Sequence, residues 1–219
     1  MRSILPADVL HQASFLLSAP NATFLPTDQG SEVAFAGRSN AGKSSALNLI
    51  TNRKGLARVS KTPGRTRLIN YFDLDGTRFL VDLPGYGYAQ VARSMRAEWD
   101  EMVGNYLQTR QALRGLVLIM DCRHPLTDYD QALLKFCAEN ELPVHVLLSK
   151  SDKLNKNDRL TTLRNVRASL MELSAGASVQ LFSALSKEGV EEAQATVAAW
   201  LGITDKKNPG TRGESGVRK

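Results

Sequence analysis

Eight consecutive residues, from Gly37 to Ser44 (GRSNAGKS), match the phosphate-binding pattern G-x-x-x-x-G-K-[ST]. Glycines allow the backbone to fold tightly, so that successive N–H groups point inward around a β-phosphate. Lys43 is expected to reach the β- and γ-phosphates, and the Ser44 hydroxyl is expected to be a ligand of Mg²⁺. A helix that begins here would add the positive end of its dipole. The expected phosphate-binding residues are Gly37, Arg38, Ser39, Asn40, Ala41, Gly42, Lys43 and Ser44.

A second motif, Asp82-Leu83-Pro84-Gly85, follows the phosphate-binding loop at the end of an apolar run. A carboxylate at the end of a strand beside such a loop can hold Mg²⁺ through water, and the glycine N–H can contact a γ-phosphate. In isolation D-x-P-G is an ordinary turn. Its place behind the phosphate-binding loop instead predicts a glycine whose position depends on the γ-phosphate.

Two further motifs have the order expected of loops that read a guanine base. Ser149-Lys150-Ser151-Asp152 is similar to [NT]-K-x-D, in which the carboxylate accepts hydrogen bonds from guanine N1–H and the N2 amino group. Adenine lacks both donors, so a buried carboxylate would be left unpaired. Ser149 stands where Asn is usual, so one contact to the phosphate-binding loop is expected to be altered. The second motif follows a later strand, with the Ala184 N–H expected at guanine O6, and comprises Phe182, Ser183 and Ala184.

A basic loop lies between these motifs. Residues 52–67 contain six basic side chains and no acidic one. Thr66 is expected to supply a second hydroxyl to Mg²⁺ and to sense the γ-phosphate, with Thr62 as the alternative. The residues of this segment expected to contact the nucleotide are Gly64, Arg65, Thr66, Arg67 and Leu68.

Alternating strands and helices would position these loops. Apolar runs predict strands at 32–36, 68–74, 77–83, 115–121, 143–149 and 179–183. Helices are expected at 43–50, 94–110, 127–140, 158–173 and 187–201, and the pattern of 7–19 favours an amphipathic helix. Asp75-Gly76 predicts a hairpin between the second and third strands. The pattern predicts an α/β fold of three layers, with a mainly parallel six-stranded sheet, one antiparallel edge strand and helices on both faces.

Composition and charge narrow the class of protein. The 219 residues are 42% hydrophobic and 23% charged, which is typical of a soluble globular domain. No apolar stretch is long enough to cross a bilayer, and the N-terminus lacks a secretory apolar region, so no membrane partner is expected. The two cysteines, Cys122 and Cys137, are expected to be reduced thiols of a cytoplasmic protein. The net charge of +6 is concentrated in the basic loop and the C-terminal tail, which favours a polyanionic partner such as RNA.

The sequence divides into an N-terminal extension (1–30) packed on the domain, a nucleotide-binding domain (31–202) and a basic tail (203–219) that is expected to be disordered. The segments AFAGRSNAGKSS, SKTPGRT, VDLPGYGYA, MDCRHPL, LLSKSDKL and LFSAL resemble, in this order, the EngB (YsxC/YihA) family of bacterial ribosome-biogenesis GTP-binding proteins. The resemblance implies a P-loop GTPase fold, GTP and GDP binding with Mg²⁺, and slow hydrolysis. It also implies association with the large ribosomal subunit during assembly and a need for the protein in division and septation. A monomer is expected.

The catalytic group is not identified by the sequence. Tyr86 stands where many small GTPases carry a water-orienting Gln, so intrinsic hydrolysis is expected to be slow. A partner or a potassium ion near Asn40 would then supply the missing assistance. Two other classes stay open: a P-loop kinase of a small acceptor, and a nucleotide-gated RNA-binding module with negligible hydrolysis. The base-reading motifs argue against the kinase, and single-turnover hydrolysis distinguishes the module from a switch.

Overall fold

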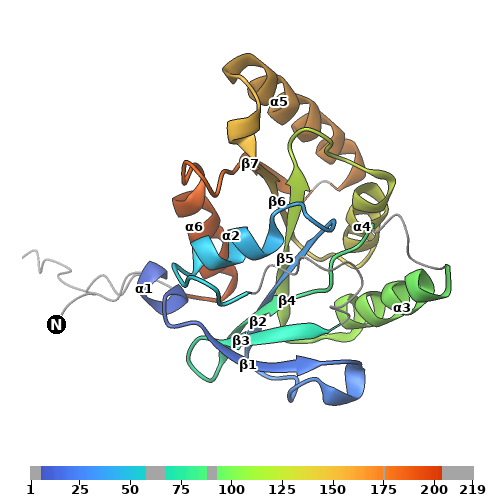
Figure 1. Cartoon of the computed structure of the whole chain (residues 1–219). Coiled ribbons are helices and arrows are strands. Elements are labelled where there is room, and N and C mark those ends of the chain that lie inside the picture. The colour runs from blue at the N-terminus through green and yellow to red at the C-terminus, as the bar shows by residue number, and fades with distance from the viewer. Residues whose placement is uncertain (1–5, 58–67, 88–92, 175, 204–219) are drawn as a thin grey trace, which may run out of the picture.

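The computed structural model describes residues 6–57, 68–87, 93–174 and 176–203, with residue 22 and residues 93–100 described at the level of the backbone. Seven described strands form one sheet in the order β1-β3-β4-β2-β5-β6-β7 (Figure 1). The strands are β1 Ser14–Ala19, β2 Ser31–Gly37, β3 Ile69–Asp73, β4 Arg78–Asp82, β5 Leu113–Asp121, β6 Val144–Ser149 and β7 Ser178–Leu181. The α-helices are α1 Pro6–Leu10, α2 Lys43–Ile50, α3 Arg93–Thr109, α4 Asp128–Glu139, α5 Lys156–Leu173 and α6 Val190–Trp200. Two short 3₁₀ turns, η1 Ala22–Phe24 and η2 Ser151–Lys153, lie in the connections.

The sheet is mainly parallel, as the sequence predicts. β2 pairs in parallel with both β4 and β5, and β6 and β7 continue the parallel order on the β5 side. β3 is antiparallel to β4 and also to β1. The predicted α/β fold is therefore confirmed, and the strands predicted from continuous apolar runs lie within a few residues of their predicted bounds.

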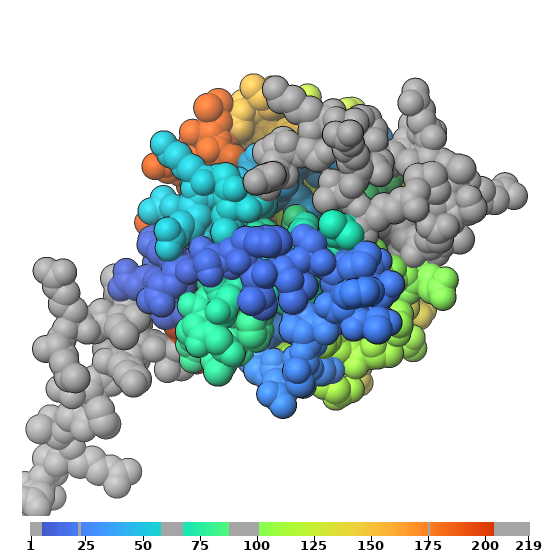
Figure 2. All heavy atoms as spheres, turned by 60° about the horizontal axis from the view of Figure 1, so that its bottom comes forward, coloured from blue at the N-terminus to red at the C-terminus, as the bar shows by residue number. Residues whose placement is uncertain are grey.

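The number of strands differs from the predicted six because β1 adds a strand at the edge. The N-terminal helix is restricted to α1, and the chain then extends into β1, which pairs with β3. The antiparallel strand β3 is consequently the second strand of the sheet and not its edge. Figure 2 shows this N-terminal segment in dark blue, spread across one side of the molecule. The residues of β3 that pair with β1 lie 50 or more positions away in the sequence, so local periodicity did not indicate a strand.

The two faces of the sheet are covered by different helices. Alternate residues of β2 point to opposite faces, so Ala34 and Ala36 belong to one apolar cluster and Val33 and Phe35 to the other. Residues of α3, α4 and α5 complete the first cluster, and residues of α1, α2 and α6 complete the second (Figure 1). This gives the predicted three layers.

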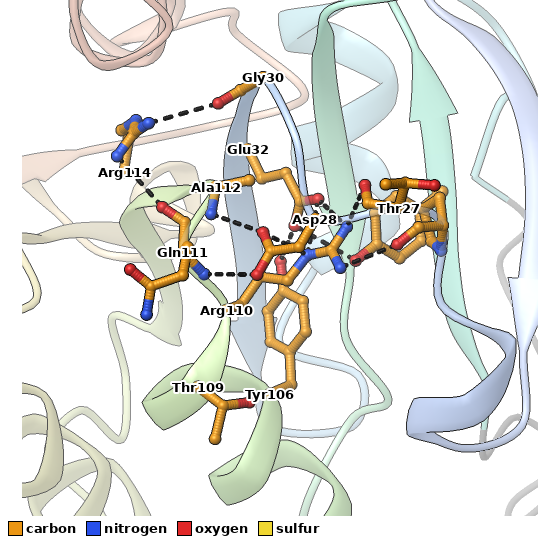
Figure 3. Close-up of polar contacts among 12 residues, drawn as sticks. Thr27, Asp28, Gly30, Glu32, Tyr106, Thr109, Arg110, Gln111, Ala112 and Arg114 are labelled. Atoms are coloured by element: carbon orange, nitrogen blue, oxygen red, sulfur yellow. Dashed lines mark hydrogen bonds and ion pairs between the residues drawn. The ribbon is translucent and has the colours of Figure 1, made fainter.

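A buried polar network lies at the amino end of β2 (Figure 3). Glu32 is fully buried, and its Oε1 accepts from Arg110 Nε at 2.9 Å and Nη2 at 2.5 Å. Its Oε2 accepts from Tyr106 Oη at 2.8 Å and Tyr71 Oη at 3.2 Å. Burial, together with the Glu32 carboxylate, raises the pKa of both phenols, so both remain donors. The network joins the end of α3 to the centre of the sheet.

The same arginine ties down the N-terminal segment. Arg110 donates to the carbonyl oxygens of Pro26 at 2.9 Å and Thr27 at 3.3 Å, and its Nε lies 3.5 Å from Asp28 Oδ1. Burial alone would raise the pKa of Asp28, but N–H groups from residues 111 and 112 and the Arg110 charge hold it below its usual value. The segment before β2 is therefore fixed to the domain by charged hydrogen bonds.

Candidate functional site

The predicted site motifs meet at the carboxyl edge of the sheet. The phosphate-binding loop follows β2, Asp82 ends β4, Ser149 ends β6, and Phe182 follows β7. Carboxyl ends of parallel strands lie at one edge, where ligands of open α/β sheets bind. Leu68 reaches the same edge because β3 runs in the opposite direction, with Asn70 paired to Asp82. The candidate residues 64–67, Thr66 among them, lie outside the described residues.

The phosphate-binding loop contains one position that has no room for a side chain and two positions with a left-handed backbone conformation. A Cβ on Gly37 would lie 2.6 Å from the Ile119 carbonyl oxygen, so the loop leaves the sheet in direct contact with β5. Gly42 has φ of 104° and immediately precedes α2, a conformation that glycine adopts without strain. Asn40 also has a positive φ, 63°. These turns direct the first N–H groups of α2 toward the edge, as a phosphate site requires.

Lys43 and Asp82 form an ion pair at this edge. Lys43 Nζ donates to Asp82 Oδ1, and the two side chains are 12% and 10% exposed. Both groups belong to motifs that the sequence assigned to phosphate and metal, and the structure brings them together from α2 and β4. The pair gives Lys43 a carboxylate partner at the place where phosphate oxygens are expected.

The donor set here fits Mg²⁺ by its chemistry. Mg²⁺ prefers hard oxygen ligands and keeps several waters, and it takes substrate phosphates in place of a full protein cage. Ser44 supplies a hydroxyl on the first turn of α2, and Asp82 supplies a carboxylate at the neighbouring strand end. Across the described residues, no group of three or more His, Cys, Asp or Glu side chains is arranged to hold a metal ion.

The predicted base-reading loop is tied to the phosphate-binding loop by Lys150. Its Nζ donates to the Asn40 carbonyl oxygen at 2.7 Å and lies 3.0 Å from Asp121 Oδ2. Arg123 donates to the same carboxylate through Nε at 2.9 Å and Nη2 at 2.6 Å. Burial would raise the pKa of Asp121, but the hydrogen bonds from Arg123 and Lys150 hold it well below its usual range. Asp121 is therefore an ionised carboxylate that holds the ammonium group of Lys150 in place.

Ser149 also contacts the phosphate-binding loop. Its hydroxyl lies close to the Ala41 carbonyl oxygen and 3.1 Å from that of Met120, and it donates its one proton to either acceptor. The sequence predicts that replacing the usual Asn alters this contact. The structure shows that the shorter serine side chain still reaches the loop through its hydroxyl.

Asp152 is held by the loop that follows β7. Ser183 Oγ donates to Asp152 Oδ1 at 2.6 Å, and this bond lowers the pKa of the carboxyl group. Ser183 Oγ in turn accepts from the N–H groups of Leu185 at 3.2 Å and Ser186 at 3.1 Å. The carboxylate is thus fixed in its ionised form, 17% exposed, with Ala184 beside it on the surface. An ionised acceptor at the mouth of the site can take two donors from one base edge.

A second contact joins these two loops below the surface. Ser151 N–H donates to the Phe182 carbonyl oxygen at 3.2 Å, and Ser151 Oγ donates to Glu188 Oε2 at 2.7 Å. Arg159 contacts the same Glu188 oxygen at 3.2 Å. The sequence did not indicate a role for Glu188, because nothing near it in the chain marks it as the partner of the S-K-S-D loop.

Tyr86 does not point into the site. It is buried, its hydroxyl donates to Asp130 Oδ1, and its ring stacks on Tyr129 with centroids 5.2 Å apart. Burial and the Asp130 carboxylate raise its pKa well above the usual value. Its backbone is bound to the phosphate-binding loop, since its carbonyl oxygen accepts from Ser39 N–H at 2.8 Å.

The partner of Tyr86 was missed by sequence reasoning. Asp130 is 2% exposed, and its Oδ2 accepts from the N–H and the hydroxyl of Thr127, both at 2.8 Å. The Asp130 N–H donates in return to Thr127 Oγ1 at 3.4 Å, and this bond together with the one from the Thr127 N–H forms a capping box at the start of α4. The T-x-x-D spacing was a visible signal for the cap, but it gave no indication of the tyrosine.

A mainly parallel sheet with a phosphate-binding loop after its central strand and two further loops at the same edge defines a P-loop protein of the GTPase class. The family model described as "50S ribosome-binding GTPase" matches residues 32–150. A probable GTP-binding protein EngB of Colwellia psychrerythraea is 53% identical over 192 residues, 88% of this chain and 86% of the relative. Its counterpart in Xanthomonas euvesicatoria pv. vesicatoria is 52% identical over 196 residues, 89% of this chain and 95% of the relative. The chain belongs to the EngB family of GTP-binding proteins.

Solved structures share the fold. A crystal structure of a probable GTP-binding protein EngB has a TM-score of 0.61 at 20% identity and covers 80% of this chain and 100% of its own. Era in complex with MgGDPNP and nucleotides 1506–1542 of 16S ribosomal RNA has a TM-score of 0.60 at 20% identity, covering 78% of this chain and 57% of its own. No helix among the described residues is both long and apolar enough to span a membrane.

Proposed function

We propose that this protein is a GTP-dependent switch that acts in assembly of the large ribosomal subunit. The observation that carries the proposal is the meeting of the phosphate-binding, D-L-P-G, S-K-S-D and S-A-L loops at one edge of the sheet, in a chain of the EngB family. The proposed binding domain is 31–202. The proposed GTP-binding residues are Gly37, Arg38, Ser39, Asn40, Ala41, Gly42, Lys43, Ser44, Gly64, Arg65, Thr66, Arg67, Leu68, Asp82, Leu83, Pro84, Gly85, Ser149, Lys150, Ser151, Asp152, Phe182, Ser183 and Ala184.

The proposed chemistry is Mg²⁺-dependent hydrolysis of GTP to GDP and phosphate. Ser44 and Thr66 would hold Mg²⁺, which neutralises charge on the β- and γ-phosphates when bound. Lys43 exchanges its Asp82 partner for phosphate oxygens, because the phosphate carries more negative charge than one carboxylate. Asp82, released from Lys43, would then be able to hold Mg²⁺ through a water molecule.

We propose that intrinsic hydrolysis is slow. The Tyr86 side chain is committed to Asp130 and Tyr129 in the core, so it supplies no group to orient the attacking water. A partner, or a potassium ion near Asn40, would supply the missing positive charge. Hydrolysis in buffers of potassium and of sodium distinguishes these two sources.

The proposed partner is the large ribosomal subunit, through ribosomal RNA, ribosomal protein or both. The family description "50S ribosome-binding GTPase" and the concentration of positive charge in residues 52–67 and in the tail support this partner. We place the protein in the cytoplasm as a monomer, and we expect cells that lack it to be defective in division and septation.

Cosedimentation with purified 50S subunits tests the proposal. We expect more protein to sediment with the subunits in a non-hydrolysable GTP analogue than in GDP, because the γ-phosphate orders the loops that the subunit contacts. Purified 30S subunits serve as the matched control for nonspecific binding to RNA. Equal sedimentation in GDP and in the analogue, or equal binding to both subunits, would contradict a nucleotide-dependent switch on the large subunit.

A further inference from the structure

One flank of α5 carries basic and apolar side chains alone. Lys156, Leu160, Arg164, Arg167 and Met171 follow one another at intervals of four, four, three and four residues. At 3.6 residues per turn these five positions fall within a sector about 80° wide. We term them the α5 stripe. Val166 and Leu170 lie outside this sector and face the core.

The whole α5 stripe is exposed, including its apolar members. Met171 is 77% exposed and Leu160 is 41% exposed, and they belong to the small set of large apolar side chains that the described chain leaves on its surface. The three basic residues are exposed as well. The stripe is therefore a continuous line of accessible side chains along a helix at one end of the sheet, beside β7 (Figure 1).

The three cations of the α5 stripe make no ion pair with any described carboxylate. Seven other cations of the described chain do make ion pairs to aspartate or glutamate: Lys43, Arg78, Arg110, Arg123, Lys150, Lys153 and Arg159. Positive charge elsewhere on the domain is thus partly neutralised within the molecule. Along the stripe it remains available to an external anion.

The acidic residues of α5 lie on its other exposed flank. Asp158 and Glu172 lie about 80° or more from the stripe around the helix, on a flank that they share with Thr161, Asn165 and Ala168. Asp158 is also engaged locally, since its Oδ2 accepts from Asn155 Nδ2 at 2.6 Å. The separation gives the helix a flank whose charged residues are all basic, in a chain whose net charge outside the basic loop and tail is slightly negative.

We propose that the α5 stripe is an RNA-contacting surface, on which Lys156, Arg164 and Arg167 bind backbone phosphates of ribosomal RNA. The inference rests on the proposed function and adds a surface to it. Guanidinium groups bind phosphate oxygens in bidentate fashion, and unpaired surface cations gain affinity by releasing counterions from RNA. Leu160 and Met171 contact sugar and base surfaces between the phosphates.

An acidic protein is the less suitable partner for this surface. Protein interfaces concentrate their energy in aromatic, Met and Arg anchors and are depleted in Lys, whereas nucleic-acid interfaces are far more positively charged. The α5 stripe has no aromatic residue, and its two apolar side chains lie about 16 Å apart along the helix axis. They do not form the continuous apolar centre that a protein interface needs.

The experiment measures affinity for naked large-subunit ribosomal RNA and for 50S subunits as a function of salt. The variant R164Q/R167Q removes two charges from exposed positions, so it is expected to fold and to keep wild-type affinity for GTP. The slope of log K against log salt should fall by about 1.4 to 1.8, since each lost phosphate contact contributes about 0.7 to 0.9. The control R114Q/K135Q removes two exposed charges outside the stripe and should leave the slope near the wild-type value.

A second variant tests the apolar part of the α5 stripe. Met171→Ser should weaken RNA binding several-fold with no change in slope, because it removes contact area and no charge. A wild-type slope for R164Q/R167Q, or an equal fall for the control, would overturn the inference. So would loss of 50S binding with undiminished binding to naked RNA, which would identify a protein partner.

The same measurements distinguish failure of the proposed function from failure of the α5 stripe alone. If the wild-type protein binds neither 50S subunits nor their RNA, both the proposed function and the α5 stripe are overturned. If the wild type binds 50S subunits in a nucleotide-dependent way and R164Q/R167Q matches it at every salt concentration, the switch stands and the stripe alone is rejected.

Discussion

Replacement of Arg110 by Met should destabilise the fold strongly without touching the nucleotide site. The guanidinium is 7% exposed and supplies both hydrogen bonds to one oxygen of the fully buried Glu32 (Figure 3). Met retains most of the apolar stem and removes only the charged head. Glu32 would then keep two phenol donors but no counterion. Removing one partner of a buried ion pair costs about 3–5 kcal/mol, because the remaining charge is desolvated and uncompensated.

The assay is urea denaturation of the nucleotide-free protein, followed by far-ultraviolet circular dichroism. Arg110→Met should lower the free energy of unfolding by that amount, and Glu32→Gln by less, because Arg110 would still have the Asp28 carboxylate as a counterion, 3.5 Å from its Nε. The double variant E32Q/R110M should be more stable than the sum of the two single losses predicts. At urea concentrations below the unfolding transition, each variant should bind GTP as tightly as the wild type does. The reason is that this network lies at the amino end of β2, whereas the nucleotide site lies at its carboxyl end. A loss below about 1 kcal/mol for Arg110→Met, or strict additivity in the double variant, would refute the reasoning.

Three further predictions concern the nucleotide edge. Lys43→Ala should abolish most triphosphate affinity in a fluorescence titration while leaving the fold intact, although it also frees Asp82; unchanged affinity would contradict the phosphate assignment. Asp152→Asn should shift preference from GTP to XTP in competition titrations, because xanthine has a carbonyl where guanine has its N2 amino group; equal losses for GTP, XTP and ATP would indicate damage to the fold instead. Tyr86→Phe should cost about 1.5–3 kcal/mol of unfolding free energy, as a hydrogen bond to the buried Asp130 is lost; an unchanged urea midpoint would show that this bond does not stabilise the protein.

The elements whose signals are local were predictable from the sequence. The helix from Lys43 follows a glycine that ends the loop, and the strand that ends at Ser149 is a continuous apolar run, so neither needs knowledge of distant residues. β1 is different. Its first three residues are exposed, its pairing with β3 contains a bulge near Phe15, and its sequence has the apolar content of a helix as well as of a strand. This segment forms a strand and not a helix because β3, whose other side pairs with β4, offers it a backbone with which to pair.

The same division holds for the site. Motifs such as that ending in Asp152 combine residue type and spacing within a few positions, so their place at the strand ends followed from the order of elements. The groups that hold the motifs in place come from distant parts of the chain. Glu188 accepts a hydrogen bond from Ser151, and Asp130 accepts one from Tyr86. Their residue types are ordinary and their partners are set by the packing of the sheet and helices. Sequence reasoning therefore identified the groups that would meet a ligand and missed those that support them.

The two ends of β2 are built for different purposes. At the amino end, Glu32 and Arg110 are buried and doubly hydrogen-bonded, so their exchange of partners would leave charges unpaired in the core. At the carboxyl end, Lys43 and Asp82 form a single contact at the edge where phosphate is expected, so a bound phosphate would offer Lys43 an anionic partner in place of Asp82. A switch needs this asymmetry: the loops that sense a phosphate must change partners readily, and the sheet that carries them must not. The prediction for Arg110→Met tests the rigid end, and the prediction for Lys43→Ala tests the exchangeable one.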